Sequence, residues 1–195
     1  MKKKTVIYLE KVGKAESGHC LAAAAQRAHE LGLSHAVVAT TSGRTALGLV
    51  RELRKLRSEA KVIGVAYAEN YAAKWGRLDP DLMHQAEGFG TDFIRGGHSM
   101  GGINTAISDK FCTLTPNKLI AQTYYTLGQG FKVAVEVALM AADQGLLPPG
   151  KEVLALGGTG EGADTALVLT PACSAEFFSL RIHEIVCMTR RGGKK

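Results

Sequence analysis

Along the chain, segments whose apolar residues follow the pattern of a strand alternate with segments whose apolar residues follow the pattern of a helix. Residues 35–39 are apolar from their second position onward, which is typical of a buried strand. The next apolar residues recur at the i, i+3, i+4 and i+7 spacing of one helix face: Ala46, Leu49, Val50, Leu53 and Leu56. A strand is therefore followed almost at once by a helix, with a short turn between them.

The same alternation extends over most of the chain. We predict strands at residues 5–9, 35–39, 61–67, 92–94 and 152–156, a further apolar segment at 167–169, and an edge or closing strand at 181–188. We predict helices at residues 17–31, 46–56, 79–88, 116–127 and 131–143. This βαβ series predicts an α/β fold with three layers, α/β/α, around a mostly parallel sheet. At this length the chain, residues 1–195, is expected to form one domain.

The distribution of charge argues against specific nucleic-acid binding. The formal net charge is +6, but seven of the 24 basic residues lie near the two ends, which leaves 17 basic residues against 18 acidic ones in the body. These seven are Lys2, Lys3, Lys4, Arg190, Arg191, Lys194 and Lys195. We therefore expect no specific nucleic-acid partner, since the body of the chain carries no basic excess.

No apolar run is long enough to span a bilayer, so we expect no membrane partner. The basic start at residues 1–4 is followed by an apolar segment too short for a signal peptide, which suggests a cytoplasmic location. The four cysteines are widely spaced without a C-x-x-C pair, so neither a metal site nor a disulfide framework is expected. Burial as small apolar residues suits them, with Cys20 as the alternative candidate for a reactive thiol.

Three glycine-rich turns follow three different predicted strands, at residues 40–46, 96–102 and 157–166. Loops after the carboxyl ends of parallel strands lie at one edge of a sheet, so these turns are expected to meet at one site. The first turn also begins a helix, where unpaired backbone N–H groups and the helix dipole attract anions. The sequence therefore predicts a phosphate-binding crevice, with ordinary loop chemistry as the alternative. Neither G-x-x-x-x-G-K-[ST] nor G-x-G-x-x-G with a downstream acid is present.

The segment 35–67, with Thr-x-Ser-Gly-x-Thr-Ala in residues 40–46 and Lys-Val-Ile-Gly-Val in residues 61–65, resembles the C-terminal α/β domain of pyruvate kinase. In that domain the matching loop binds a phosphate of a sugar-bisphosphate effector, and a later glycine-rich turn closes the site. The resemblance implies that Thr41, Ser42, Gly43 and Thr45 bind phosphate. The later turn corresponds to residues 157–165.

Over nearly its whole length the chain resembles stand-alone archaeal and bacterial proteins built on this domain, for example at residues 129–133, 140–143, 162–172 and 181–184. These relatives look like flavin mononucleotide (FMN) binders, so the resemblance implies FMN as the cofactor. The catalytic barrel of pyruvate kinase has no counterpart in this sequence, so no phosphoenolpyruvate chemistry is expected. A homo-oligomer is consistent with the resemblance, because the parent domain contributes to subunit contacts.

Individual side chains at the predicted site have alternative roles. His98 is a candidate for contact with a ligand ring or for acid–base work, and Asp164 for accepting a ribityl hydroxyl or capping its own segment. Trp75, Tyr67, Tyr71 and Arg77 are candidates for an aromatic wall over a flavin or for a peripheral packing cluster. The remaining cofactor-binding candidates in the second and third turns are Gly97, Ser99, Gly157, Gly158, Thr159, Gly162, Ala163 and Thr165.

These candidates support three hypotheses of function. The first is binding of a phosphorylated small ligand, FMN above all. The second is an oxidoreductase that uses the flavin, and the third is a sugar-phosphate sensor without flavin. No catalytic residue can be assigned from the sequence.

Overall fold

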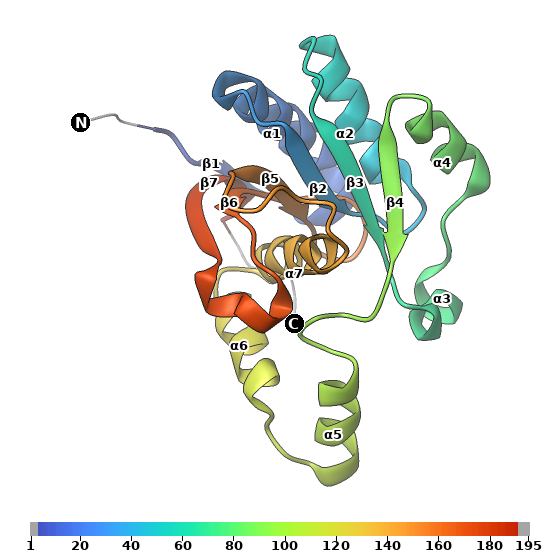
Figure 1. The fold of residues 1–195 in the computed structure, drawn as a ribbon, viewed down its shortest axis with the longest axis vertical. Helices are drawn as coiled ribbons and strands as arrows, with labels where there is room; N and C mark the ends of the chain where they lie inside the picture. Colours follow the sequence, from blue (N-terminus) through green and yellow to red (C-terminus); the bar gives the residue numbers. More distant parts are fainter. Residues whose placement is uncertain (1–3, 191–195) are drawn as a thin grey trace.

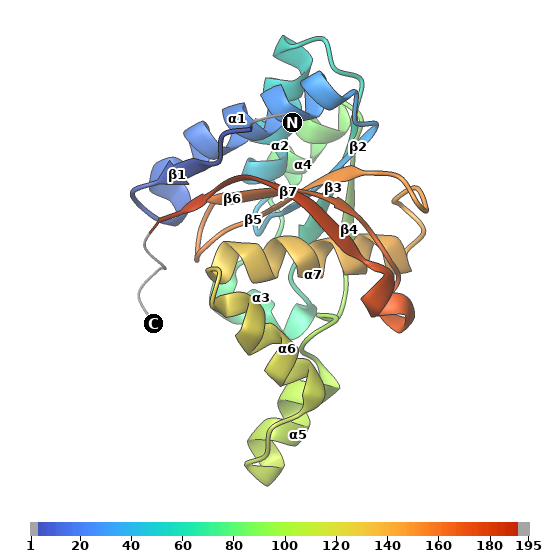
Figure 2. The same ribbon diagram turned by 90° about the vertical axis from the view of Figure 1, so that its left-hand side faces the viewer.

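The computed structural model describes residues 4–190 and has a seven-stranded sheet between two layers of helices (Figure 1; Figure 2). The strands are β1 (Ile7–Leu9), β2 (His35–Ala39), β3 (Lys61–Ala66), β4 (Thr91–Arg95), β5 (Val153–Gly157), β6 (Thr165–Thr170) and β7 (Arg181–Thr189). The helices are α1 (Ser17–Leu31), α2 (Arg44–Lys55), α3 (Glu69–Trp75), α4 (Pro80–Glu87), α5 (Ile103–Phe111), α6 (Pro116–Tyr125) and α7 (Gln129–Asp143), with short 3-10 helices η1 (Gly13–Glu16) and η2 (Ser174–Ser179). The basic residues Lys2, Lys3, Arg191, Lys194 and Lys195 lie outside the described residues.

The strand order β1-β7-β6-β5-β2-β3-β4 confirms the predicted mostly parallel sheet. Strands β5, β2, β3 and β4 pair in parallel, and β1 pairs in parallel with β7. Strand β6 is antiparallel to both of its neighbours, β5 and β7. The segment predicted as an edge or closing strand at 181–188 forms β7, the last strand along the chain; the edge position itself belongs to β1, which pairs with residues 187–189 of β7.

Both faces of the central strands β2, β3, β5 and β6 are buried, which explains why these strands are almost continuously apolar rather than alternating. Successive residues of a strand point to opposite faces. Val38 and Val62 therefore pack toward α1, α2 and α4, while their neighbours Val37 and Ile63 pack toward α7. Figure 2 shows α1, α2 and α4 on one side of the sheet and α7 on the other. None of the helices in residues 4–190 is both long and apolar enough to cross a membrane.

Local sequence features begin or end three of the helices. Pro80 is the first residue of α4, and the Asp79 carboxylate accepts the backbone N–H groups of Asp81 (2.9 Å) and Leu82 (3.2 Å). Pro116 likewise begins α6 after Thr115, whose hydroxyl accepts a backbone N–H. Gly32 ends α1 at a φ of 61°, a left-handed conformation that favours glycine.

Two helices were not predicted, and both lie beside the site described below. Helix α3 has only seven residues, too few for a helical period to be recognised. Helix α5 projects from the body of the domain (Figure 1) and leaves Ile103 and Phe111 exposed. Because these apolar residues of α5 do not pack on the core, the helix shows no clear division into an apolar and a polar face.

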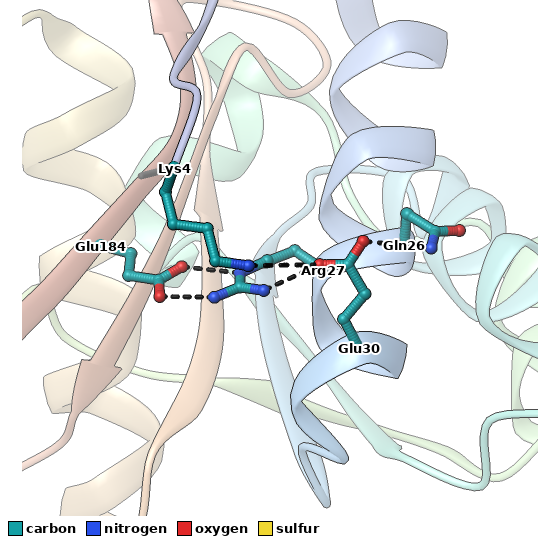
Figure 3. Close-up of polar contacts among 5 residues, drawn as sticks. All are labelled: Lys4, Gln26, Arg27, Glu30 and Glu184. Atoms are coloured by element: carbon teal, nitrogen blue, oxygen red, sulfur yellow. Dashed lines mark hydrogen bonds and ion pairs between the residues drawn. The ribbon is translucent and has the colours of Figure 1, made fainter. Parts of the chain in front are cut away.

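An ion-pair network joins the N-terminal half of the chain to its last strand (Figure 3). The guanidinium of Arg27 on α1 donates from Nε and Nη2 to the two carboxylate oxygens of Glu184 on β7, at 2.7 and 2.6 Å. A third bond runs from Nη1 to Glu30 at 2.8 Å. The two-point geometry fixes α1 over the antiparallel half of the sheet.

Candidate functional site

A cavity of about 220 Å³ lies at the edge of the sheet where β2, β3 and β5 end. All three glycine-rich turns contribute to its lining, together with the segment after β3 and one side of α7. In open α/β sheets, ligands bind outside the carboxyl ends of the strands, and this cavity has that position. It is the candidate functional site.

The first turn leads into α2, and its N-cap residue, Gly43, has no side chain that could cap the helix. Gly43 precedes the helix at a φ of 95°, and its N–H donates to the Thr40 hydroxyl at 3.0 Å. The backbone N–H groups of Thr45 and Ala46 lie in the first helical turn, where helix geometry provides no acceptor. This end of the cavity therefore offers donors and a positive helix dipole to an anion.

The four predicted phosphate ligands fall into two groups. Thr41 and Thr45 line the cavity. Ser42 and Gly43 are not among the lining residues and build the turn instead: the Ser42 hydroxyl accepts the Arg44 N–H at 3.4 Å, and its carbonyl accepts the Asp79 N–H at 3.0 Å.

Of the predicted residues in the second turn, only His98 lines the cavity. Gly97 borders a neighbouring hollow formed with α3 and α5. The Ser99 hydroxyl accepts from Ser174 at 3.1 Å, and the Ser99 carbonyl from Asn117 at 3.4 Å. The structure thus brings His98 to the site and gives Ser99 bonds to other segments.

The third turn lines the cavity through Gly158 and Gly162, together with Gly160, which we had not singled out. Gly157 packs so closely on α7 that a side chain there would meet the backbone of the helix. Three further candidates face inward, away from the cavity: Ala163, Asp164 and Thr165, all at most 1% exposed. Thr159 is likewise not part of the lining.

Asp164 has a structural environment. Its Oδ2 accepts the backbone N–H groups of Gly13 (2.8 Å) and Thr159 (3.0 Å), and its Oδ1 accepts the Thr165 hydroxyl (3.0 Å). The side chain is fully buried. This geometry favours the structural alternative over contact with a ribityl hydroxyl, because three donors from the protein already surround the carboxylate.

An aromatic cluster forms another wall. The ring of Tyr67, directly after β3, stacks with Trp75 of α3 at 6.1 Å between centroids. Tyr71 stacks with His98 at 5.1 Å and an angle of 15° between the ring planes. All four rings line the cavity, whereas Arg77 does not and instead pairs with Glu69. The cluster is therefore part of the site rather than a remote packing feature.

The sequence interpretation missed the polar residues that α6 and α7 supply. Tyr125, Gln129, Lys132 and Glu136 all line the cavity. Lys132 and Glu136 form an ion pair whose side chains are only 9% and 6% exposed. The signal for this pair was present, since two opposite charges four residues apart interrupt an otherwise apolar helix.

Burial controls the ionisation of the residues around this pair. Desolvation lowers the pKa of His98, and the nearby Lys132 adds to that effect while Glu136 opposes it. Desolvation also raises the pKa of Tyr125, with Glu136 acting in the same direction. A neutral imidazole therefore faces the cavity near pH 7. Within residues 4–190, no three side chains of His, Cys, Asp or Glu converge as metal ligands would.

Fold and cavity together define an α/β domain whose ligand-binding edge is formed by turns at the carboxyl ends of parallel strands. Comparison with protein families gives the class its name. The model of the pyruvate kinase alpha/beta domain matches residues 19–169, from α1 to β6. The chain belongs to this family.

Proposed function

We propose that this domain binds a phosphorylated small molecule, with the phosphate at the N-terminus of α2. The observation that carries the proposal is a helix N-terminus with glycine as its N-cap residue, beside which two threonine hydroxyls, from Thr41 and Thr45, line a cavity. Backbone N–H groups and hydroxyls directed at one place are the usual phosphate ligands of α/β proteins.

FMN is the ligand that we propose first. Its phosphate would lie at Thr41 and Thr45, and its planar ring system would lie against Tyr67 and Trp75, since aromatic faces stack on flat ligands. The cavity volume of about 220 Å³ limits this fit. Sites for drug-sized ligands span roughly 300–1,000 Å³, so part of the flavin would lie outside the cavity, beside the half-exposed Trp75.

The same small volume favours a second candidate, a sugar phosphate without a ring system. Such a ligand would use the α2 N-terminus in the same way and would fit inside the cavity entirely. The two candidates differ in what they require of the aromatic wall: the flavin needs Trp75 as a stacking surface, whereas a sugar phosphate does not.

Matched ligands test the proposal. Titration of the purified protein with FMN, followed by flavin fluorescence, is compared with riboflavin, which differs only by the phosphate. We expect FMN to bind at least about tenfold more tightly, because charge-assisted hydrogen bonds contribute roughly 1.5–3 kcal/mol. Equal affinities would contradict a phosphate site at α2. A thermal-shift screen of sugar phosphates forms the second arm, and binding there without FMN binding would refute the flavin version alone.

A matched pair of variants locates the phosphate. Thr45→Asp places a carboxylate in the cavity, at a helix N-terminus where acidic residues are tolerated, and we expect it to abolish binding of every phosphorylated probe. Thr123→Asp makes the same change on the exposed face of α6 and should leave binding unaffected. Absence of binding of any phosphorylated compound to the wild type would refute the whole proposal.

A further inference from the structure

The ion pair of α7 is an unusual feature of the cavity wall because one of its members has unused donors. The Lys132 ammonium donates to Glu136 Oε2, and Glu136 Oε1 accepts the backbone N–H of Met100 at 3.0 Å. Both carboxylate oxygens are thus engaged. A protonated lysine has three N–H donors, and in residues 4–190 the structure records only the Glu136 carboxylate as their acceptor.

Unused donors on a buried ammonium are costly, because a charged group loses its hydration when it leaves water. The ring of Tyr125, 5.9 Å from Lys132 Nζ, supplies a weak contact on one side. The Lys132 side chain, about nine-tenths buried, also lines the cavity. A ligand acceptor in the cavity would satisfy the remaining donors.

The pair approaches the cavity from the layer opposite the proposed phosphate site. Helix α2 covers one face of the sheet and α7 covers the other (Figure 2). The α2 N-terminus and the Lys132 ammonium therefore border the cavity from two sides. A ligand between them would be held at two points.

We propose that Lys132 is a second ligand-binding point, which donates to a carbonyl oxygen at the end of the ligand away from its phosphate. This inference rests on the proposed function of the same cavity. A carbonyl is favoured over a second anion because the Glu136 carboxylate already neutralises Lys132 and would repel another negative charge. The ligand class is thus an organic phosphate that carries a ketone, aldehyde or ring carbonyl, and Glu136 is a positioning residue.

Simple organic phosphates separate the two binding points. The probes are oxoalkyl phosphates with the carbonyl two to six carbons from the ester oxygen, each compared by calorimetry with the alkyl phosphate of equal length. At one length or more we expect the wild type to prefer the oxo compound by about ten- to a hundredfold, the usual effect of a hydrogen bond to a charged group. Carboxyalkyl phosphates of the same lengths should bind more weakly than the oxo compounds.

Two variants assign the preference to Lys132. Lys132→Met combined with Glu136→Gln removes the donors without leaving a buried carboxylate unpaired. In this double variant the ratio of affinities for oxoalkyl and alkyl phosphates should fall to about one, while the affinity for alkyl phosphates stays as in the wild type. Glu136→Gln alone keeps the lysine and an amide oxygen that can accept its N–H, so the oxo-to-alkyl preference should persist, whereas carboxyalkyl phosphates should bind more tightly than to the wild type because the repelling negative charge is gone. Circular dichroism and thermal unfolding check that both variants fold.

The outcomes distinguish the two proposals. If no phosphate compound binds the wild type, the proposed function fails. If alkyl and oxo phosphates bind equally at every length, the second binding point is refuted while the phosphate site stands, and this result requires no variant. If the double variant binds neither the alkyl nor the oxoalkyl phosphates, Lys132 binds the phosphate itself, which also overturns the inference.

Discussion

Replacement of Asp164 tests how the third turn is held in place. This carboxylate accepts one hydrogen bond from η1, through Gly13, and two from its own turn, through Thr159 and Thr165. It therefore ties the segment before α1 to the turn after β5, which borders the cavity. Asp164→Ala removes all three acceptor contacts, whereas Asp164→Asn can keep the two to backbone N–H groups and replace the third by a donor contact.

The expected magnitudes follow from the number of partners. In the alanine variant the N–H groups of Gly13 and Thr159 lose their acceptor, and each unsatisfied donor costs about 1–3 kcal/mol, so we expect a total loss of roughly 2–6 kcal/mol. In the asparagine variant the amide oxygen can accept both N–H groups while its NH₂ donates to the Thr165 hydroxyl. Only the charge is lost, at about 1–2 kcal/mol.

Urea unfolding followed by circular dichroism measures both losses. For a chain of this length the alanine variant should also lower the melting temperature by about 4–24 °C. Equal, small losses below about 1 kcal/mol in both variants would refute the structural role. A variant that unfolds like the wild type and no longer binds phosphate compounds would instead assign the carboxylate to the ligand.

Three further predictions concern charges and thiols. Arg27→Met should cost about 1–2 kcal/mol, because it removes a two-point contact with the partly buried Glu184. The hydrogen bonds from Arg27 lower the pKa of Glu184, so wild-type stability is lost as the pH falls through that lowered value. In urea titrations at decreasing pH, the variant should therefore lose less stability than the wild type. Parallel curves of stability against pH would contradict this. Burial lowers the pKa of His98, so protonation below about pH 6.5 favours the unfolded chain. His98→Gln should therefore lose less stability than the wild type as the pH falls from 7.5 to 5. The same change of the urea midpoint with pH in both proteins would be inconsistent with this. Thiol titration should label the exposed Cys112 and Cys173 in the native protein, and the buried Cys20 and Cys187 only after unfolding. Contact with the Cys187 thiol and burial raise the pKa of Cys20 well above its usual range, so rapid labelling of a third thiol would disprove the packing of α1 on β7.

The layers of the fold were predictable because local signals agree with long-range packing. The 35–39 run and the helix after it are buried as their periods predict, and Pro80 and Pro116 begin their helices. The position of β1 beside β7 was not predictable in this way. Pairing between residues 7–9 and 187–189 leaves no local trace, since three residues are too few for a pattern.

The site was predictable to the extent that strand ends determine it. The carboxyl ends of parallel strands meet at one edge, so turns that follow different strands meet there as well. Which residue of a turn faces the cavity depends on packing that the sequence does not reveal. Thr41 and Thr45 line the cavity while Ser42 between them does not, although all three carry a hydroxyl group.

The glycines of the third turn show why motif and site overlap only in part. Gly157 and Gly130 lie where β5 meets the first turn of α7, and a side chain at either position would collide with the opposing segment. Glycine at these positions allows α7 to approach the sheet closely. That approach in turn places Lys132 and Glu136, within the next two helical turns, at the cavity wall. The third turn therefore shapes the site in two ways, through the glycines in its lining and through the helix that it allows to dock. That helix adds a buried ion pair to the hydroxyl groups of the first turn.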